Sequence, residues 1–435
     1  MRRLLLLCSL ALLLASLPRS VAANSGLNST NVRVTDVSLI SGADAEHPAI
    51  AAWGNTVYAV WRDNRHYYPY SSLSYSIYMA ISTNGGATWS NNVRVSDPDY
   101  EGYLGYPAIA VGPNNQVWIA WTILACYLDN PCGNADLRND VRLAFSDDGG
   151  ATFTEVTAWD GNDASTGKQT PELALAPDTG TLYIMVHNVS DVDGDGYDIF
   201  LRILDFANQE LRNVKLNSGH GNGRVNQVIG PRMSLTMRGQ KICAAWEDRR
   251  SSAIYGTCST DGGASFGTNF RISPAAGYYP RIALGADGTL FALYQQDQGR
   301  GLFLRRSSNL GNSWSVPIVI SPPNVSEAVS DFDIKALPDR RLVVTWNSIF
   351  TLTGDLHFAV STDNGNTFQV FTPVEDNQGS TPIAAKQYHA RLAVDHSGRL
   401  NRVNLIWSDN RNTQYQIWST FALLRQNVYV PLVTR

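Results

Sequence analysis

The chain has 435 residues, of which 44% are hydrophobic and 17% charged, so it holds enough apolar material for a large core. Its 35 Gly, 19 Pro, 11 Trp, 19 Tyr and 14 Phe residues favour strands and turns over helices. A net charge of −4 argues against nucleic acid and anionic membrane surfaces as partners.

The N-terminus has the composition of a secretory signal peptide. Arg2 and Arg3 supply positive charge, residues 4–14 are apolar, and Val21–Ala23 offers small residues for cleavage. We expect residues 1–23 to be removed and the mature chain to be secreted or extracellular, with the cell surface as the alternative. No later apolar run approaches the ~18 residues of a membrane-spanning helix, so we expect no span in the mature chain.

Seven units of about 50–64 residues follow, and each begins with a similar apolar segment. These segments are PAIAAW (48–53), PAIAVG (107–112), PELALA (171–176), PRMSLT (231–236), PRIALG (280–285), FDIKAL (332–337) and ARLAVD (390–395). Further short β-type segments separated by turns follow each one, which indicates a four-stranded antiparallel blade per unit. The sequence therefore predicts an all-β fold, a single β-propeller with seven blades or, as the alternative, six.

The N-terminal part of the mature chain is predicted to close the ring. The seventh unit lacks a fourth strand, and NVRVTD (31–36) closely resembles NVRVSD (92–97), which holds the fourth strand of the first unit. We expect the former segment to complete the seventh blade. Residues 31–422 then form one domain, followed by an apolar C-terminal tail at 423–435.

One short phrase occurs five times, after the third strand of a unit. Its copies are STNGGATW (82–89), SDDGGATF (146–153), STDGGASF (259–266), SSNLGNSW (307–314) and STDNGNTF (361–368). The Asp or Asn can bond backbone N–H groups and the Gly tolerates positive φ, so the phrase predicts a stapled turn. A catalyst needs single, asymmetric groups, and fivefold repetition therefore argues against a catalytic role for this Asp.

The five phrases resemble the Asp-box, or bacterial neuraminidase repeat (BNR), of the sialidase superfamily. The resemblance runs from about Asn31 to Ala422 and implies a β-propeller glycosidase that acts on extracellular glycans, with its site on the face opposite these turns. Asp-box propellers also occur that only bind, so two functions stay open. The chain is either a glycoside hydrolase of exo-sialidase type or a non-catalytic propeller that binds glycan or protein.

On that opposite face, the start of the inner strand contributes one residue per blade, and this set does not repeat. Its members are Ala49, Ala108, Glu172, Arg232, Arg281, Asp333 and Arg391. Arginine forks bind carboxylates bidentately, and the resemblance implies that the three arginines hold the carboxylate of a substrate. The candidate catalytic residues are Glu172, Asp333 and, as the nucleophile that the resemblance implies, Tyr388. The alternative is a charge-balanced plug that binds nothing.

A second phrase, Trp-x-Asp-x-Arg, lies between the second and third strands of three units, at 61–65, 246–250 and 407–411. Carboxylate and guanidinium groups both bind hydroxyls, so these loops are candidate glycan contacts. The residues are Asp63, Arg65, Asp248, Arg250, Asp409 and Arg411. The alternative is an Asp that caps the loop and an Arg that ties neighbouring blades together.

Two smaller patterns predict a metal and disulfides. The segment DVDGDGYD (191–198) opens like a calcium loop, with Asp191, Asp193, Asp195 and the carbonyl of Tyr197 as ligands, or else is an acidic turn. In an oxidising compartment, the cysteines pair locally as Cys126–Cys132 and Cys243–Cys258. The sequence has no nucleotide-binding glycine loop, so we expect no nucleotide as partner. We expect a monomer that binds a glycan or glycoprotein. No cofactor should be required, and calcium, if it binds, is structural.

Overall fold

The structure is a computed structural model of the 435-residue chain. It describes residues 26–27, 31–36, 43–66, 75–98, 103–124, 139–159, 168–188, 198–205, 210–218, 233–248, 251–296, 300–321, 329–348, 356–371, 374, 387–395, 397, 401–411 and 414–424. These residues form strands and turns, and none of them belongs to a helix that could cross a membrane.

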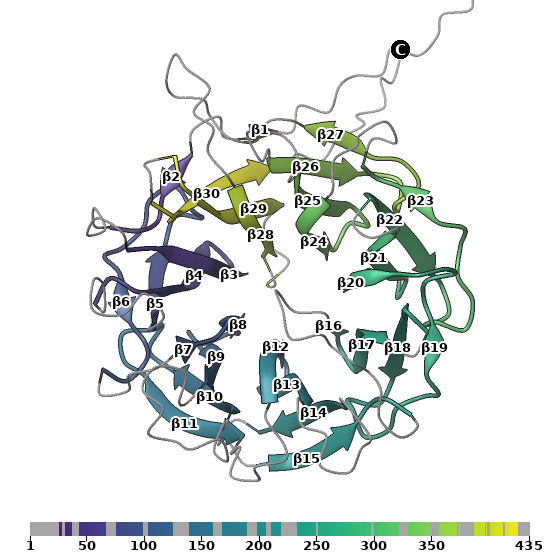
Figure 1. The fold of residues 1–435 in the computed structure, drawn as a ribbon, viewed down its shortest axis with the longest axis horizontal. Helices are drawn as coiled ribbons and strands as arrows, with labels where there is room; N and C mark the ends of the chain where they lie inside the picture. Colours follow the sequence, from purple (N-terminus) through teal and green to yellow (C-terminus); the bar gives the residue numbers. More distant parts are fainter. Residues whose placement is uncertain are drawn as a thin grey trace, which may run out of the picture.

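Seven antiparallel sheets stand around a central axis, which confirms the seven-bladed propeller (Figure 1). Blade 1 contains β3 (Ala45–Trp53), β4 (Thr56–Asp63), β5 (Ser76–Ser82) and β6 (Val93–Arg94). Blade 2 contains β7 (Tyr103–Leu104), β8 (Ala108–Val111), β9 (Val117–Leu124), β10 (Asn139–Ser146) and β11 (Thr154–Trp159). Blade 3 contains β12 (Lys168–Ala176), β13 (Thr181–Asn188), β14 (Ile199–Leu204) and β15 (Glu210–Lys215).

The second half of the ring repeats this order. Blade 4 contains β16 (Met233–Arg238), β17 (Lys241–Asp248), β18 (Ala253–Ser259) and β19 (Phe270–Arg271). Blade 5 contains β20 (Tyr278–Leu284), β21 (Leu290–Gln296), β22 (Arg300–Ser307) and β23 (Ile318–Val319). Blade 6 contains β24 (Val329–Ala336), β25 (Leu342–Ser348), β26 (Leu356–Ser361) and β27 (Gln369–Phe371). Blade 7 contains β28 (Gln387–Val394), β29 (Arg402–Asp409) and β30 (Gln416–Leu423).

Both ends of the chain build the seventh blade. The N-terminal strands β1 (Gly26–Leu27) and β2 (Val32–Arg33) pair antiparallel with β30, with Val32 opposite Ser419. Blade 7 also meets blade 1 directly, because the backbone N–H of Gly54 donates to Asp395 Oδ1 at 2.7 Å. The predicted closure of the ring by the N-terminal strand is therefore confirmed.

The core lies between adjacent blades. The second strands are buried almost throughout, and their large aromatic residues are the bulkiest fully buried side chains. The residues are Trp61, Trp118, Trp121, Trp246, Tyr294, Trp346 and Trp407. One apolar cluster, for example, joins Tyr58 and Met79 of blade 1 to Ile119 and Trp121 of blade 2. Burial of each such side chain contributes about 1.5–3 kcal/mol, which holds the blades side by side.

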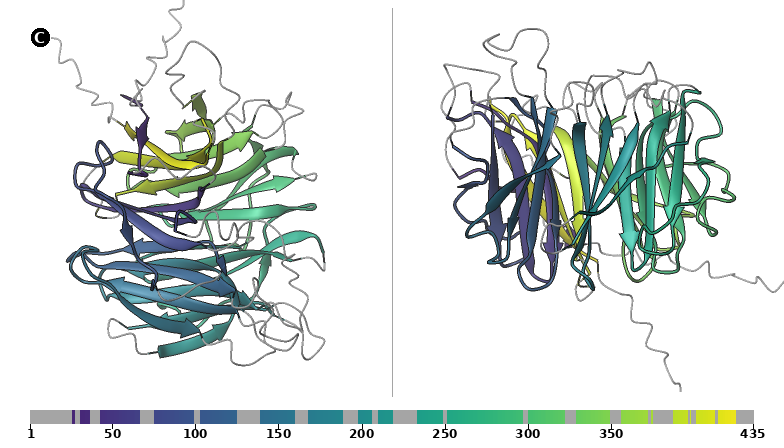
Figure 2. Two further views of the ribbon diagram at one scale, coloured as in Figure 1. Left: turned by 60° about the vertical axis from the view of Figure 1, so that its left-hand side comes forward. Right: turned by 90° about the horizontal axis from the view of Figure 1, so that it is seen from below.

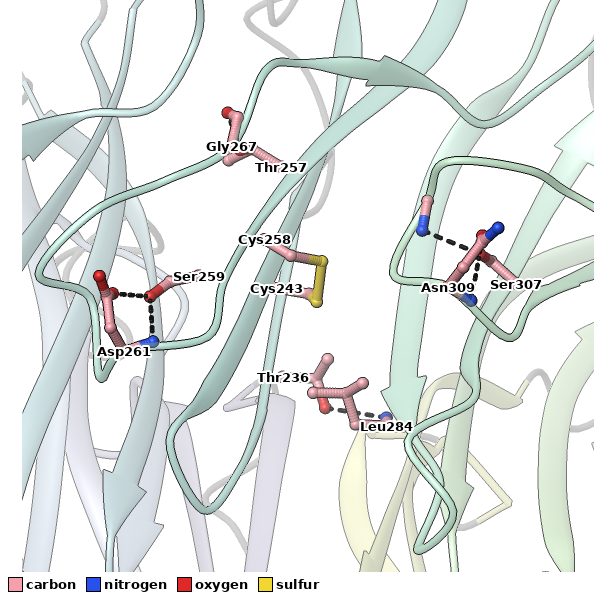
Figure 3. The surroundings of a disulfide bond; sticks show 11 residues. Thr236, Cys243, Thr257, Cys258, Ser259, Asp261, Gly267, Leu284, Ser307 and Asn309 are labelled. Carbon is pink, nitrogen blue, oxygen red and sulfur yellow. Dashed lines mark hydrogen bonds between the residues drawn. A yellow bond between two sulfur atoms is a disulfide. The ribbon is translucent and has the colours of Figure 1, made fainter.

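The five repeated turns share one hydrogen-bond pattern. In each copy the serine Oγ accepts the N–H of the second glycine position at 2.8 Å and donates to the Asp or Asn two residues later. Figure 3 shows the contact between the serine and the Asp or Asn at Ser259–Asp261 and Ser307–Asn309. These contacts hold the turn together, as expected for a structural phrase.

One predicted disulfide is present. Cys243 on β17 and Cys258 on β18 face each other in register and are bonded (Figure 3). The other predicted pair, Cys126–Cys132, lies outside the described residues.

The turns and the inner-strand starts lie at opposite ends of each blade. In blade 1, Ser82 of the repeated turn is opposite Val57, whereas Glu46 is opposite Arg62, near the other end of β4. The side view in Figure 2 shows the strands running between two faces of the ring. The charged positions predicted from the sequence therefore gather on the face without these turns.

Candidate functional site

A β-bulge interrupts the inner strand of five blades close to this face. The register shifts lie between Glu46 and Ala49, Gln169 and Glu172, Tyr278 and Arg281, Ser330 and Phe332, and Tyr388 and Arg391. One residue in each bulge has positive φ: His47 (52°), Thr170 (45°), Tyr279 (54°), Asp331 (41°) and His389 (59°). Such residues cost about 1–3 kcal/mol and cluster at functional sites. Because bulges re-aim side chains, each one directs the residue two positions later toward the axis.

The bulges surround a cavity of about 140 Å³ at the mouth of the axial channel. Six of the seven predicted ring residues line it: Ala49, Ala108, Glu172, Arg281, Asp333 and Arg391. The seventh, Arg232, lies outside the described residues. The structure therefore brings these six side chains together, and their part in binding or catalysis stays a prediction.

Arg281 and Glu172 form an ion pair across the channel. Arg281 Nη1 lies 2.8 Å from Glu172 Oε1, and the two side chains are 10% and 23% exposed. The same guanidinium donates to the carbonyls of Phe332 and Met233. Glu172 Oε2 accepts no hydrogen bond from the described residues, so this oxygen is the one available to a ligand.

Asp333 is a buried, ionised carboxylate. Its Oδ1 accepts the N–H of Ile334 and lies 3.3 Å from Lys335 Nζ, while its Oδ2 accepts the N–H of Leu392 on the next blade. Burial by itself would raise the pKa of Asp333, but three nearby cations outweigh it and lower the pKa below the ordinary 3.8. The cations are those of Lys335, Arg281 and Arg391. Asp333 therefore stays charged near neutral pH and cannot serve as a proton donor there.

Arg391 differs from Arg281 because it has no carboxylate within ion-pair distance among the described residues. Its Nη1 donates to the carbonyl of Ala390 at 2.8 Å. Burial, followed by repulsion from Arg281, lowers the pKa of Arg391 below its usual range, while nearby carboxylates oppose that shift. An arginine side chain nevertheless stays protonated in proteins. Arg391 thus presents a charged fork to the cavity.

A cluster of aromatic and charged residues, which we call the rim cluster, lies beside this cavity. Its members are Glu46, His47, Arg62, Tyr106 and His389. The ring centroid of His47 lies 4.1 Å from that of Tyr106 and 3.6 Å from that of His389. Arg62 forms an ion pair with Glu46 at 2.8 Å and lies over the ring of Tyr106.

The sequence reasoning missed the rim cluster. A signal was available, since an X-Pro pair precedes the inner strand of five units at Pro48, Pro107, Pro171, Pro231 and Pro280. The residue before a proline is restricted in conformation, so the residue two positions before the ring position could have been singled out.

Tyr388 lies beside the rim cluster and does not line the cavity. Its ring packs against Tyr415, with centroids 5.9 Å apart. Burial, together with Tyr388, Glu46 and Asp44, raises the pKa of Tyr415 to about 12. The nucleophile role of Tyr388 stays a prediction.

The Trp-x-Asp-x-Arg loops are closed by their own residues. Asp63 and Asp409 are fully buried, and each accepts hydrogen bonds from the indole N–H two residues before it and from the arginine two residues after it. Arg65 and Arg411 stack on Tyr78 and Trp418. These contacts match the capping alternative, and glycan contact by these residues stays a prediction.

Some predicted residues cannot be placed. Asp248 is buried at the end of β17, but its partner Arg250 lies outside the described residues. The candidate calcium ligands Asp191, Asp193, Asp195 and Tyr197 lie outside them as well.

Comparison by sequence gives no match to a family model, and none to a curated protein. Comparison by structure gives many matches. A protein of unknown function from Dyadobacter fermentans superposes with a TM-score of 0.54 at 11% identity, over 92% of this chain and 100% of that one. The α-L-arabinofuranosidase Arb93A from Fusarium graminearum, in complex with an iminosugar inhibitor, gives 0.53 at 10% identity, over 91% and 98%. The Hadza microbial sialidase Hz136 gives 0.48 at 13% identity, over 88% and 66%.

What these proteins share with the chain is the propeller fold. One of them, Arb93A, is a glycosidase by name. At these identities the likeness carries no assignment of residues, so any activity has to be argued from the cavity itself.

Proposed function

We propose that the chain is a secreted glycoside hydrolase of the propeller type, with its site at the channel mouth and an acidic sugar as its ligand. The observation that supports this proposal is Arg391, a charged fork that faces the cavity without a carboxylate partner among the described residues. A guanidinium of this kind binds a carboxylate through two parallel hydrogen bonds. A sugar acid supplies that carboxylate together with hydroxyl groups.

Each charged group around the cavity then has a distinct task. Arg391 binds the carboxylate of the ligand. Glu172, held by Arg281 through one oxygen, directs its other oxygen to the bound sugar as the reacting carboxylate. Asp333 stays ionised and stabilises the positive charge that develops on the sugar in the transition state. Secretion is part of the proposal, and the Cys243–Cys258 disulfide supports an oxidising compartment.

A second candidate function is binding without turnover. It is favoured by the contacts of Asp333, whose two oxygens are already occupied by backbone N–H groups and Lys335. With Arg281 paired to Glu172 as well, much of the charge around the cavity is balanced internally, as in a binding site that performs no chemistry.

A panel of fluorogenic glycosides and a glycan array would distinguish the two functions. The panel holds sialic acid, glucuronic acid, galacturonic acid and neutral arabinofuranose substrates. Arg391→Met removes the fork, and Arg33→Met, on the exposed outer strand β2, is the matched control. We expect turnover of an acidic glycoside that falls at least about tenfold in Arg391→Met and not in Arg33→Met.

Binding of acidic glycans without release of the fluorophore selects the second function. If the arabinofuranoside is hydrolysed and Arg391→Met leaves that rate unchanged, the proposal of an acidic ligand is wrong.

A further inference from the structure

His47 is held in an unusual backbone conformation at the edge of the cavity. It occupies the positive-φ position of the β3 bulge, at 52°, and its side chain lines the same cavity as Arg391. That conformation is uncommon for residues other than Gly, although Asn, Asp and His adopt it more often than the rest. The fold keeps it nonetheless, and the imidazole thereby reaches the channel mouth.

The ring of His47 is fixed by its neighbours. Tyr106 packs against it edge-on, with an interplanar angle of 84°, and His389 lies against it at 51°. His389 is itself positioned by hydrogen bonds, because its Nδ1 lies 3.1 Å from Ser408 Oγ and that hydroxyl donates to the carbonyl of Tyr388. Since the hydroxyl proton is used there, Nδ1 of His389 is the donor toward Ser408.

The nitrogens of His47 have no hydrogen-bond partner among the described residues. The imidazole of the equivalent residue in blade 7, His389, bonds to Ser408. Burial, then His389, Arg62 and Arg391, lower the pKa of His47 well below 6.5, so the ring is neutral near neutral pH. A neutral imidazole carries one donor and one acceptor, which matches a hydroxyl group that both accepts and donates.

We propose that His47 determines which acidic sugar the site accepts, by bonding a hydroxyl of the sugar whose carboxylate is bound by Arg391. This inference rests on the proposed function. It adds that His47 recognises one feature of the ligand, the orientation of a ring hydroxyl relative to the carboxylate. Arg391 then supplies affinity for sugar acids in general, and His47 supplies the choice among them. Discrimination of this kind is strong because an unmatched polar group in a closed site is left without a partner.

Three methyl glycosides test the inference, those of glucuronic, galacturonic and mannuronic acid, which share the carboxylate and differ in the orientation of hydroxyls. Their affinities are measured by calorimetry for the full chain and for His47→Gly, which removes the side chain and suits positive φ. Tyr279→Gly, at the equivalent bulge position of blade 5 with φ 54°, is the matched control, because that residue does not line the cavity. His47→Asn, which keeps a donor and an acceptor and tolerates positive φ, serves as the conservative variant.

We expect the wild-type affinities for the three uronides to differ by about tenfold or more. His47→Gly should reduce that spread to within about threefold, while Tyr279→Gly keeps it and His47→Asn restores part of it. Arg391→Met should weaken all three by a similar factor. If Arg391→Met weakens binding but His47→Gly keeps the full spread, or if the wild type does not discriminate, the inference is overturned and the proposed function stands. If the wild type binds none of the uronides or sialic acid, both fail.

Discussion

Arg281 and Arg391 occupy equivalent positions on blades 5 and 7, yet replacement by methionine should destabilise the protein only at Arg281. Arg281→Met removes the ion pair with Glu172 and two hydrogen bonds to main-chain carbonyls. Breaking a buried pair costs about 3–5 kcal/mol, because the remaining charge loses its partner. Since the Glu172 side chain is 23% exposed, we expect the lower end of that range, about 3 kcal/mol.

Arg391→Met removes a cation with one hydrogen bond, to Ala390 O, and no ion-pair partner among the described residues. Losing that hydrogen bond costs about 1 kcal/mol. Replacing a buried charge by an apolar side chain of similar length removes a desolvation penalty on the order of several kcal/mol, less the attraction toward Asp333 and Glu172. We therefore expect Arg391→Met to be as stable as the wild type, or up to about 2 kcal/mol more stable.

Differential scanning calorimetry at pH 7 measures this difference. With an unfolding entropy of about 2.1 cal/mol/K per residue over roughly 400 residues, 1 kcal/mol shifts Tm by about 1.2 °C. The two variants should therefore differ by about 4–6 °C, with Arg391→Met the more stable. A gap below about 1 °C, or an Arg391→Met protein as destabilised as Arg281→Met, would refute the view that Arg391 is kept for a ligand.

Three further predictions concern the scaffold and its pH response. Replacing Cys243 and Cys258 by alanine opens a loop with a sequence separation of 15 and should cost about 3 kcal/mol in urea unfolding, a loss that a reductant reproduces in the wild type. Ser259→Ala removes the acceptor of a buried turn N–H and should cost about 1–2 kcal/mol in the same assay, whereas an unchanged midpoint would contradict the stapled turn. Burial first, together with neighbouring charges, lowers the pKa of His47 and His389 below 6.5. The unfolded chain therefore binds protons that the folded chain does not, and stability should fall as the pH drops below 6.5, by up to about 1.4 kcal/mol per pH unit for each histidine. His47→Gly should have a shallower slope in urea titrations between pH 7 and 5, and a slope equal to that of the wild type would contradict the assignment.

The fold could be predicted from the sequence because the same local pattern is repeated around the ring. Turn phrases such as 259–266 gave the register of each blade, and the register in turn placed Glu172, Arg281 and Arg391 at one end of the inner strands. The closing strand at 31–36 was found by its likeness to 92–97, and its pairing with β30 follows from that likeness.

The rest of the site depends on contacts between blades, which no single segment encodes. Whether Arg281 or Arg391 is the paired arginine is decided by the approach of Glu172 from another blade. The rim position of His47 requires a bulge with positive φ, an uncommon conformation that arises here from the irregular pairing of β3 with β4. Local propensity predicts neither feature.

The junction where the ring closes has a consequence for binding. His47 lies on β3 of blade 1 and Arg391 on β28 of blade 7, so a ligand held by both would bridge the first and the last inner strands of the chain. Such a ligand would stabilise the closed ring in addition to the β2–β30 pairing, and this stabilisation would rise with the logarithm of the ligand concentration. Ligand binding at the channel mouth would therefore increase the stability of the junction between blades 7 and 1, where the two ends of the chain meet.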